Sequence, residues 1–281
     1  MPNRRRAQSN AAFTGFFTQD ANFGYLGNQT AEILPIVAGP LPDNACLLNS
    51  ASLSVPNSIA PGEIVTIPGR GLGPAAGVVF QLDQQGRVPS TLGGTRVLFD
   101  GAPAPVLYAS DGQVNAIAPF HLMPGSSVTL TVESQGRTTP PTTVAVQATQ
   151  PGLFTLDGSG GGPVLAFNQD GTLNTPANPA ALGSIVTLFA NGTGVTNPAS
   201  VEGAVAPSIE ARPVGQSLVE LEGAANLDVL YYGPSPGSLT SITQMNLRLP
   251  ATVPQLFPLS AWPIYFNLNG LPTQLPTISL K

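Results

Sequence analysis

The chain has 281 residues, enough for two domains of ordinary size that each bury a core. Only 9% of the residues are charged, against about 25% in an average soluble protein, and the formal net charge is −5. Such a chain lacks the basic surface that nucleic-acid binding needs, and no apolar run approaches the ~18 residues of a membrane span. We therefore expect neither a nucleic-acid partner nor a membrane-spanning helix.

Turn-forming residues are dispersed along the whole chain. There are 31 Gly and 30 Pro, and they separate short apolar runs with no helical periodicity. This pattern is typical of all-β sandwiches. Cys46 is the only cysteine, which excludes an intrachain disulfide and a thiolate metal site. We expect no cofactor and no metal.

Residues 1–45 match nothing else in the chain and are predicted to form an N-terminal arm. The basic cluster 4–6 suits a solvated tail, and no apolar stretch after it is long enough to make a signal peptide visible. The apolar stretches Phe13–Phe17 and Ile33–Val37 are too hydrophobic for a tail that stays in water. We expect the arm to add a β-strand to a sandwich, in its own molecule or in a neighbouring one.

After the arm the sequence repeats itself, with the same landmarks in the same order. A Gly-x-Ile-Val-Thr strand, a Gly-x-Gly turn, four further strands and a final strand recur in the same order. The matched segments are 62–67 with 183–188, 71–73 with 192–194, 97–101 with 219–223, 106–108 with 229–231, 113–119 with 244–250, 128–132 with 262–266 and 143–146 with 277–280. Each unit of about 100 residues with some seven short strands predicts an immunoglobulin-like β-sandwich.

The predicted fold is therefore all-β, with two tandem immunoglobulin-like β-sandwiches. The first sandwich should span 46–148 and the second 182–281. Between them, residues 149–181 contain two short strand-like runs around a Gly-rich loop and an Asp170-Gly171 turn signal. We expect this connector to be an ordered β-hairpin that pairs with the second sandwich.

Several of these segments resemble one known family. NSAS at 49–52, APGEIVTIPGRGLG at 60–73, the QVN septet, and PGLFTLDGSG with NQDGTLN and NPAALGSIVTL in the connector are similar to the uncharacterised C-terminal domain family of Solibacter-type soil bacteria. The resemblance covers about 49–281. It implies IPT/TIG-like immunoglobulin sandwiches and an extracellular setting, and it implies no activity.

The most unusual motif is the septet Gln-x-Asn-x-x-x-Pro, QVNAIAP at 113–119 and QMNLRLP at 244–250. In a strand the two amides project on one face and the apolar residues on the other. Gln113, Asn115, Gln244 and Asn246 are expected to be structural, bonding the backbone of the loop after Tyr108 or Tyr231. Ligand-binding amides are the alternative reading.

Candidates for catalysis are few. His121 is the only histidine, and the second unit has Thr252 in its place. Glu220 and Glu222 alternate with apolar residues, as on the solvent face of a strand. The loop 168–174 carries one carboxylate, which suits a structural turn better than a calcium site. We expect no catalytic residues, and a small hydrolase is the alternative.

Aromatic side chains provide the remaining candidates for binding. Trp262 aligns with the core position Val128 and is expected to be buried. Tyr231, Tyr232 and Tyr265 are the candidates for exposed rings that could bind a carbohydrate. The expected function is that of a non-catalytic extracellular or cell-surface structural or adhesive protein, one form of which is a fibre subunit that self-associates through its arm. A carbohydrate-binding module with a polysaccharide partner is the alternative.

Overall fold

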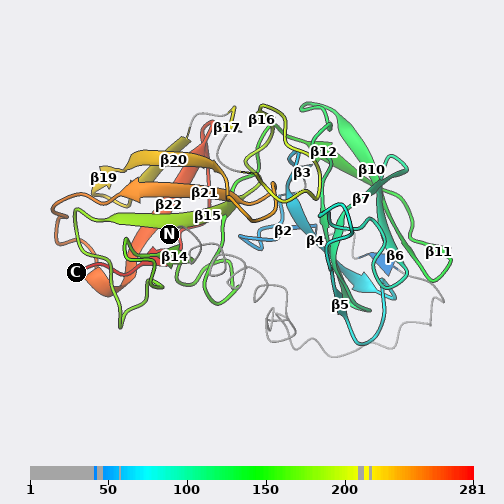
Figure 1. The fold of residues 1–281 in the computed structure, drawn as a ribbon, viewed down its shortest axis with the longest axis horizontal. Helices are drawn as coiled ribbons and strands as arrows, with labels where there is room; N and C mark the ends of the chain where they lie inside the picture. Colours follow the sequence, from blue (N-terminus) through cyan, green and yellow to red (C-terminus); the bar gives the residue numbers. More distant parts are fainter. Residues whose placement is uncertain (1–40, 43–46, 57, 208–211, 215–216) are drawn as a thin grey trace.

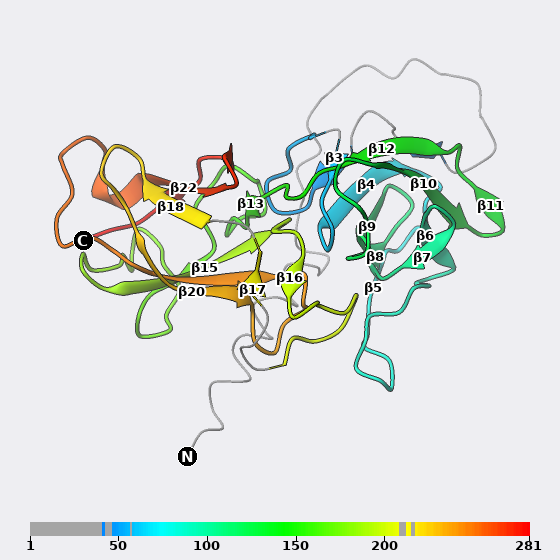
Figure 2. The same cartoon turned by 90° about the horizontal axis from the view of Figure 1, so that it is seen from above.

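The computed structural model describes residues 41–42, 47–56, 58–207, 212–214 and 217–281. The described chain is all-β and forms two sandwiches that lie side by side along the long axis of the molecule (Figures 1 and 2). Its only helix is the 3-10 turn η1 (Leu259–Ala261). The prediction of two tandem immunoglobulin-like sandwiches is confirmed.

The first sandwich consists of two six-stranded sheets. One has the order β1-β4-β9-β8-β5, with β2 also paired to β4. Its strands are β1 (Leu41–Pro42), β2 (Leu48–Asn49), β4 (Ile64–Arg70), β5 (Val78–Val79), β8 (Val106–Ala109) and β9 (Gln113–Ile117). The other has the order β3-β12-β10-β6-β7, with β11 paired to β10. Its strands are β3 (Ser58–Ile59), β6 (Thr95–Phe99), β7 (Ala102–Ala104), β10 (Ser127–Ser134), β11 (Arg137–Thr138) and β12 (Thr142–Val146).

The second sandwich repeats this topology. One sheet has the order β13-β15-β21-β20, with β14 also paired to β15. Its strands are β13 (Gly152–Leu153), β14 (Ala166–Phe167), β15 (Ile185–Asn191), β20 (Asp228–Pro234) and β21 (Thr243–Arg248). The other has the order β19-β18-β22-β23, with β24 paired to β22. Its strands are β18 (Ser217–Leu221), β19 (Ala225–Asn226), β22 (Trp262–Leu268), β23 (Leu271–Pro272) and β24 (Thr277–Ile278), and a separate ribbon joins β16 (Thr196–Asn197) to β17 (Arg212–Pro213).

The repeat extends to irregularities within the strands. The pairing of β8 with β9 slips by one residue between Val106 and Tyr108, and that of β20 with β21 slips between Val229 and Tyr231. The same bulge therefore occurs at Leu107 and at Leu230, which are counterparts in the two units. Because a bulge re-aims the side chains of a strand, this shared feature fixes the register of both copies.

Each sandwich buries its own core, and one long strand in each shows strict alternation. In β10 and β22 every second side chain is buried, and Trp262 is fully buried in the second core. Met245, Leu247 and Leu249 are also buried there, which places the apolar side of the second septet in the core.

The connector joins the second sandwich, as the sequence predicts. β13 and β14 both pair antiparallel with β15, Leu153 with Ala190 and Ala166 with Leu188. The observed strands are shorter than the apolar runs that predicted them, and the side chains of Phe154 and Leu165 lie in a further core between the sandwiches.

Of the arm, the structure describes only β1. This two-residue strand pairs antiparallel with β4 of its own chain, Leu41 with Arg70. Residues 1–40 and 43–46, with the apolar stretches on which strand addition was predicted, lie outside the described residues.

Candidate functional site

The two septets lie at equivalent places, on β9 and β21. In the first copy the side-chain amide of Gln113 donates to Oδ1 of Asn115 at 2.7 Å, and in the second that of Gln244 donates to Oδ1 of Asn246 at 2.9 Å. The amides therefore bond chiefly to each other, along one face of the strand. The expected bonds to the loop backbone are not among them, because the two side chains at i and i+2 already lie within reach of one another. The hydroxyl of Ser235, in the loop between β20 and β21, donates to Gln244 at 3.2 Å.

Replacing either asparagine by alanine should destabilise its own sandwich. Asn115 is 1% exposed, whereas Asn246 is half-buried and also accepts from Thr187 at 3.1 Å. We expect Asn115→Ala to cost about 1–3 kcal/mol, since Gln113 loses its acceptor, and Asn246→Ala to cost less. Chemical denaturation measures both values. Variants that unfold like the wild type but lose a ligand would contradict the structural reading.

A polar network lies where the two sandwiches meet. Asn191, at the end of β15, accepts from the backbone N–H of Ile64 at 2.8 Å and donates to its carbonyl at 2.7 Å. Asn49, at the end of β2, donates to the carboxyl of Glu63 at 2.9 Å and to the carbonyl of Gln150 at 2.8 Å. These side chains therefore satisfy backbone groups that the contact between the sandwiches removes from water.

Glu63 is the one fully buried carboxyl of the described chain. Its second oxygen accepts from the backbone N–H of Ala60 at 2.7 Å. Burial raises the pKa of Glu63 to about 8, against the opposing effect of its hydrogen bonds from Ala60 and Asn49. The second repeat has Ser184 at this position, so the carboxyl belongs to the joint between the sandwiches and not to the repeat itself.

Around this network the joint contains an apolar core of its own. Leu107 and Ile117 contribute apolar side chains from the first sandwich. Phe154 of the connector and Phe189 and Ile242 of the second sandwich belong to the same buried cluster. The complete buried set is Ala51, Ile64, Val88, Leu107, Ile117, Phe154, Leu165, Phe189, Leu239 and Ile242. Residues from the first sandwich, the connector and the second sandwich thus share one core, which fixes the two sandwiches against each other.

One glycine of the repeat is explained by this joint. Gly192 has φ +74°, and a Cβ atom there would lie 1.9 Å from the carbonyl oxygen of Gln150. The Gly-x-Gly of the second unit is therefore needed for close approach of the connector as well as for the turn.

None of the joint residues was singled out from the sequence as functional. Asn49 and Glu63 lie inside segments that the sequence analysis used for the family resemblance or the repeat, and Asn191 directly precedes the Gly-x-Gly turn of the second unit. The sequence did contain a signal for the joint. Glu63 stands at a repeat position where the second copy has Ser184, and charged residues are few in this chain.

The three tyrosine candidates occupy different environments. Tyr232 is 8% exposed, packs against Phe266 with ring centroids 5.8 Å apart, and belongs to the second core. The expectation of an exposed Tyr232 ring is therefore wrong. The bulge at Leu230 shifts the alternation, so that Tyr232 and not Tyr231 points inward.

Tyr265 lies on the outer face of the sheet β19-β18-β22-β23, where its hydroxyl donates to Oε2 of Glu220. This bond to a carboxylate, more than the slight burial of the ring, raises the pKa of Tyr265 to about 12. Tyr231 is half-buried on β20 of the other sheet, so the two rings lie on opposite sheets of the sandwich and do not form one platform.

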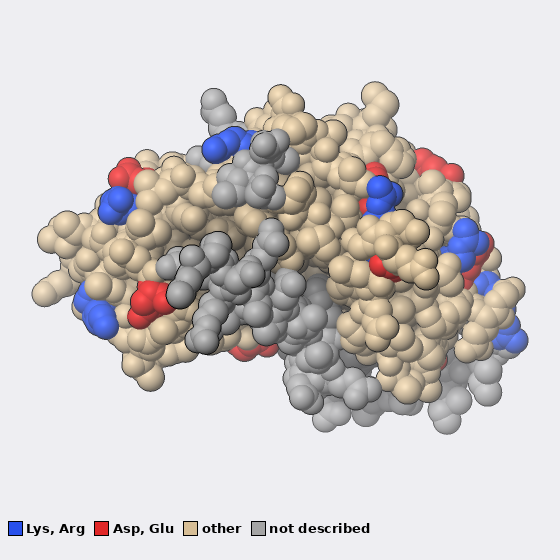
Figure 3. All heavy atoms as spheres, in the orientation of Figure 1, with Lys and Arg blue, Asp and Glu red and all other residues tan. Residues whose placement is uncertain are grey.

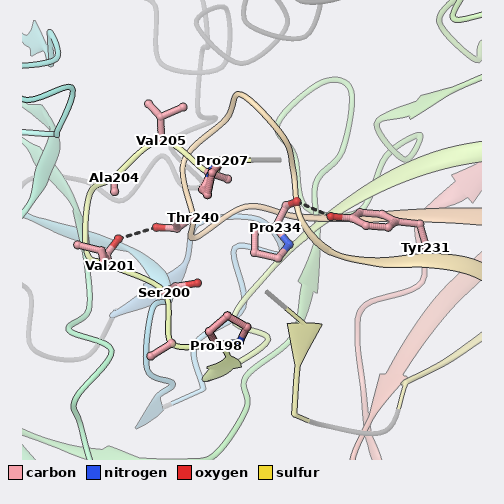
Figure 4. Close-up of a pocket in the computed structure, with 11 residues that line it drawn as sticks. Pro198, Ser200, Val201, Ala204, Val205, Pro207, Tyr231, Pro234 and Thr240 are labelled. Carbon is pink, nitrogen blue, oxygen red and sulfur yellow. Dashed lines mark hydrogen bonds between the residues drawn. The ribbon is translucent and has the colours of Figure 1, made fainter. Parts of the chain in front are cut away.

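Tyr231 instead lines a pocket of about 190 Å³ (Figure 4). Its hydroxyl donates to the carbonyl of Pro234 at 2.8 Å, and Thr240 donates to the carbonyl of Val201 at 2.8 Å. The lining residues are Pro198, Ala199, Ser200, Val201, Ala204, Val205, Ala206, Pro207, Tyr231, Pro234 and Thr240. Because the lining is mostly apolar and these two hydroxyl protons are already donated, the pocket suits an apolar side chain better than a sugar.

His121 is a surface residue beside the joint. Its side chain is 70% exposed, and Nδ1 lies 3.6 Å from Oε1 of Glu202 in the second sandwich. The same oxygen accepts from the backbone N–H of Phe120 at 2.9 Å, so Glu202 is held by the first sandwich without the imidazole.

We expect His121→Ala to leave the fold and any hydrolytic activity essentially unchanged. The exposed pair with Glu202 is worth at most about 1 kcal/mol, and the backbone bond of Glu202 stays in place. Thermal melting and assays with ester and glycoside substrates measure the effect. A specific activity that is abolished by this change would support an enzyme.

The loop 168–174 uses its polar groups internally. Oδ1 of Asp170 accepts from the backbone N–H and the hydroxyl of Thr172, at 3.0 and 2.6 Å, and these bonds are the main reason that the pKa of Asp170 is lowered. Asn168 and Asn178 bond across the loop. This arrangement is that of a turn. Within the described residues no cluster of three His, Cys, Asp or Glu could hold a metal ion.

Comparisons with known proteins agree with the fold. The model of the IPT/TIG domain family matches residues 50–148, which form the first sandwich. No curated protein matches the chain. Similar solved structures include SGBP-B from a complex xyloglucan utilization locus in Bacteroides uniformis, with 12% identity over 79% of this chain and 46% of that one and a TM-score of 0.27.

Two further similar structures are also larger proteins. They are the surface glycan-binding protein PbSGBP-B from Prevotella bryantii (12% identity, 89% of this chain, 42% of that chain, TM-score 0.26) and the gamma-CGTase from alkalophilic Bacillus clarkii (12%, 78%, 25%, 0.22). The chain spans less than half the length of each of these proteins.

Proposed function

We propose that this protein is a non-catalytic structural or adhesive protein of the cell surface or the extracellular space, which self-associates through its N-terminal arm into fibres. The main support is the joint, in which a third apolar core and the hydrogen bonds of Asn49 and Asn191 combine two sandwiches into one rigid unit. A rigid unit of this kind transmits force and holds its two ends at a constant separation.

Two further observations support this proposal. Charged side chains are scattered over the face shown in Figure 3 and do not gather into one patch, so little electrostatic repulsion opposes contacts between copies. The resemblance of 49–281 to the Solibacter-type family adds an extracellular setting. No helix of the described chain has the length and apolar character to span a membrane.

The test is the mass of the purified full chain, measured by light scattering over a range of concentrations and accompanied by imaging. We expect assemblies larger than the monomer. A matched chain with Ile33→Asp and Ile36→Asp, which places charges on both sides of the apolar stretch of the arm, should stay monomeric with an unchanged melting temperature. A wild-type chain that is monomeric at all concentrations would contradict the proposal.

Carbohydrate binding is the second candidate, and the ring of Tyr265 on the outer face of the sheet β19-β18-β22-β23 is the observation that favours it. Polysaccharide pull-down with the wild type, Tyr231→Ala and Tyr265→Ala tests it. Binding that depends on one of the two rings would support a carbohydrate-binding module. Equal retention of all three proteins would point to a non-specific contact.

A further inference from the structure

The connector runs beside residues 274–281 of the second sandwich, which we call the final segment. Hydrogen bonds from the connector, and from Leu182 directly after it, meet the final segment in the same order along both, so the two run parallel. In chain order the bonded pairs are Leu153 with Gln274, Val164 with Thr277, Asn174 with Ser279, Ala180 with Ser279, and Leu182 with Lys281. The final segment therefore has a parallel partner along most of its length.

Two side-chain amides add to the backbone bonds of this contact. Asn174 is 3% exposed, donates to the carbonyl of Ser279 at 2.8 Å and accepts from the backbone N–H of the same residue at 2.9 Å. Gln274 accepts from the backbone N–H of Leu153 at 3.3 Å and donates to its carbonyl. Because an amide side chain is both donor and acceptor, each of these residues bonds to a backbone as a paired strand residue would.

The repeated fold does not require so long a contact. In the first sandwich the corresponding strand β12 has a parallel partner of only two residues, β3, with Ser58 opposite Ala145 and Ile59 opposite Val146. The longer contact in the second sandwich is made by the connector, which lies outside the two repeated units. A role beyond the formation of a sandwich would account for it.

The direction of the two segments determines how tension acts on them. The connector enters from the joint, since Phe154 lies in the shared core next to the bonded pair of Leu153 and Gln274. Lys281 lies at the end of the second sandwich away from the first (Figures 1 and 2). Tension between the first sandwich and Lys281 therefore pulls the two parallel segments in opposite directions along their length. Bonds loaded in this way share the force, whereas bonds in a pair that is peeled from one end break one at a time.

We propose that the connector and the final segment form a clamp that keeps the second sandwich folded under tension along the long axis of the molecule. This inference rests on the proposed structural or adhesive function, which supplies the tension, and it names the part that bears the load. On its other side the final segment pairs antiparallel with β22, Ile278 with Trp262. Ile278 and Leu280 are buried in the second core, so a sliding of the final segment would also expose apolar side chains to water.

Stretching single molecules of the full chain between handles at its two ends tests the clamp. Asn174→Ala removes both bonds from the connector to Ser279. At constant tension we expect the second sandwich of this variant to unfold about tenfold faster than that of the wild type, because the lost bonds carry load and forced unfolding is governed by the unfolding rate. The second sandwich and its connector are longer than the first sandwich, so their unfolding is recognised by the larger gain in length.

Thr243→Val is the matched control in the same sandwich. Thr243 is 2% exposed, and its hydroxyl forms a buried hydrogen bond with that of Thr193 at 2.7 Å, a bond that involves neither the connector nor the final segment. This variant should have a lower free energy of unfolding in urea and the lifetime of the wild type under tension. A wild-type lifetime for Asn174→Ala, or an equal loss of lifetime in Thr243→Val, would overturn the clamp.

Gln274→Ala removes the bonds to Leu153 and is judged by the same outcomes if Asn174→Ala fails to fold by circular dichroism. Because the molecules are stretched one at a time, the result does not depend on association. A chain that is monomeric by light scattering would overturn the proposed function, whereas only the lifetimes under tension decide the clamp.

Discussion

Raising the pH from about 5 to about 9 should destabilise the folded protein, and Glu63→Gln should remove most of this dependence. Burial raises the pKa of Glu63 from 4.5 to about 8, so the folded protein keeps a proton that the unfolded chain releases. The stabilisation from this carboxyl is complete below pH 4.5 and is lost as the pH rises toward 8. Each pH unit in this window changes the free energy of unfolding by up to ~1.4 kcal/mol, which makes several kcal/mol an upper bound for the total.

Urea denaturation at a series of pH values measures this effect, and the difference between wild type and variant isolates Glu63 from other titrating groups. The informative quantity is the slope of the free energy of unfolding against pH. The side-chain amide introduced by Glu63→Gln faces two hydrogen-bond donors, Asn49 and the backbone N–H of Ala60, and therefore lowers stability by a similar amount at every pH. Glu222→Gln, a half-buried carboxyl of the second sandwich, is the control and should keep the wild-type slope. Equal slopes for wild type and Glu63→Gln would show that Glu63 is ionised in the folded state.

Phe154→Ala should cost about 3–5 kcal/mol and should split the unfolding transition into two. The ring of Phe154 is 2% exposed and lies in the core shared by both sandwiches, and its backbone N–H donates to Phe189 at 3.0 Å. While the shared core is intact, neither sandwich can unfold without exposing the apolar face of the other, so we expect the wild type to unfold in one transition. Calorimetry compares the two proteins.

Phe99→Ala is the control for this change. Phe99 is 1% exposed but belongs to the core of the first sandwich alone. We expect a loss of similar size without decoupling, because the joint is untouched. A wild type that already unfolds in two transitions, or a Phe154→Ala protein that unfolds in one, would mean that the shared core does not couple the sandwiches.

Local patterns predicted most of the fold. The paired landmarks of the two units specify the same strand order in both sandwiches, and alternation along each strand identifies the face that is buried. Trp262 could be placed in the core from its alignment with Val128 alone, because side chains two residues apart share a face of a strand whatever the rest of the chain does. The same rule placed the two amides of each septet on one face of their strand, where they bond to each other.

Alternation fails where the strand is irregular or where a second domain covers the solvent face. Tyr231 and Tyr232 were both expected outside at the start of a loop, but β20 continues to Pro234 and the bulge at Leu230 turns Tyr232 inward. No residue type marks the bulge. The outward-facing Leu107 is fully buried for a different reason, which is the second sandwich packed over it.

The sequence by itself determined two repeated sandwiches and their connector, since these depend on periods of two residues and on an internal repeat. Only the tertiary structure decided the joint. The bond between Ile64 and Asn191 links residues 127 positions apart, and the burial of Glu63 depends on how one sandwich is placed against the other. That placement arises from side chains of three separate segments meeting in one core, and contacts between distant segments leave no local period in the chain.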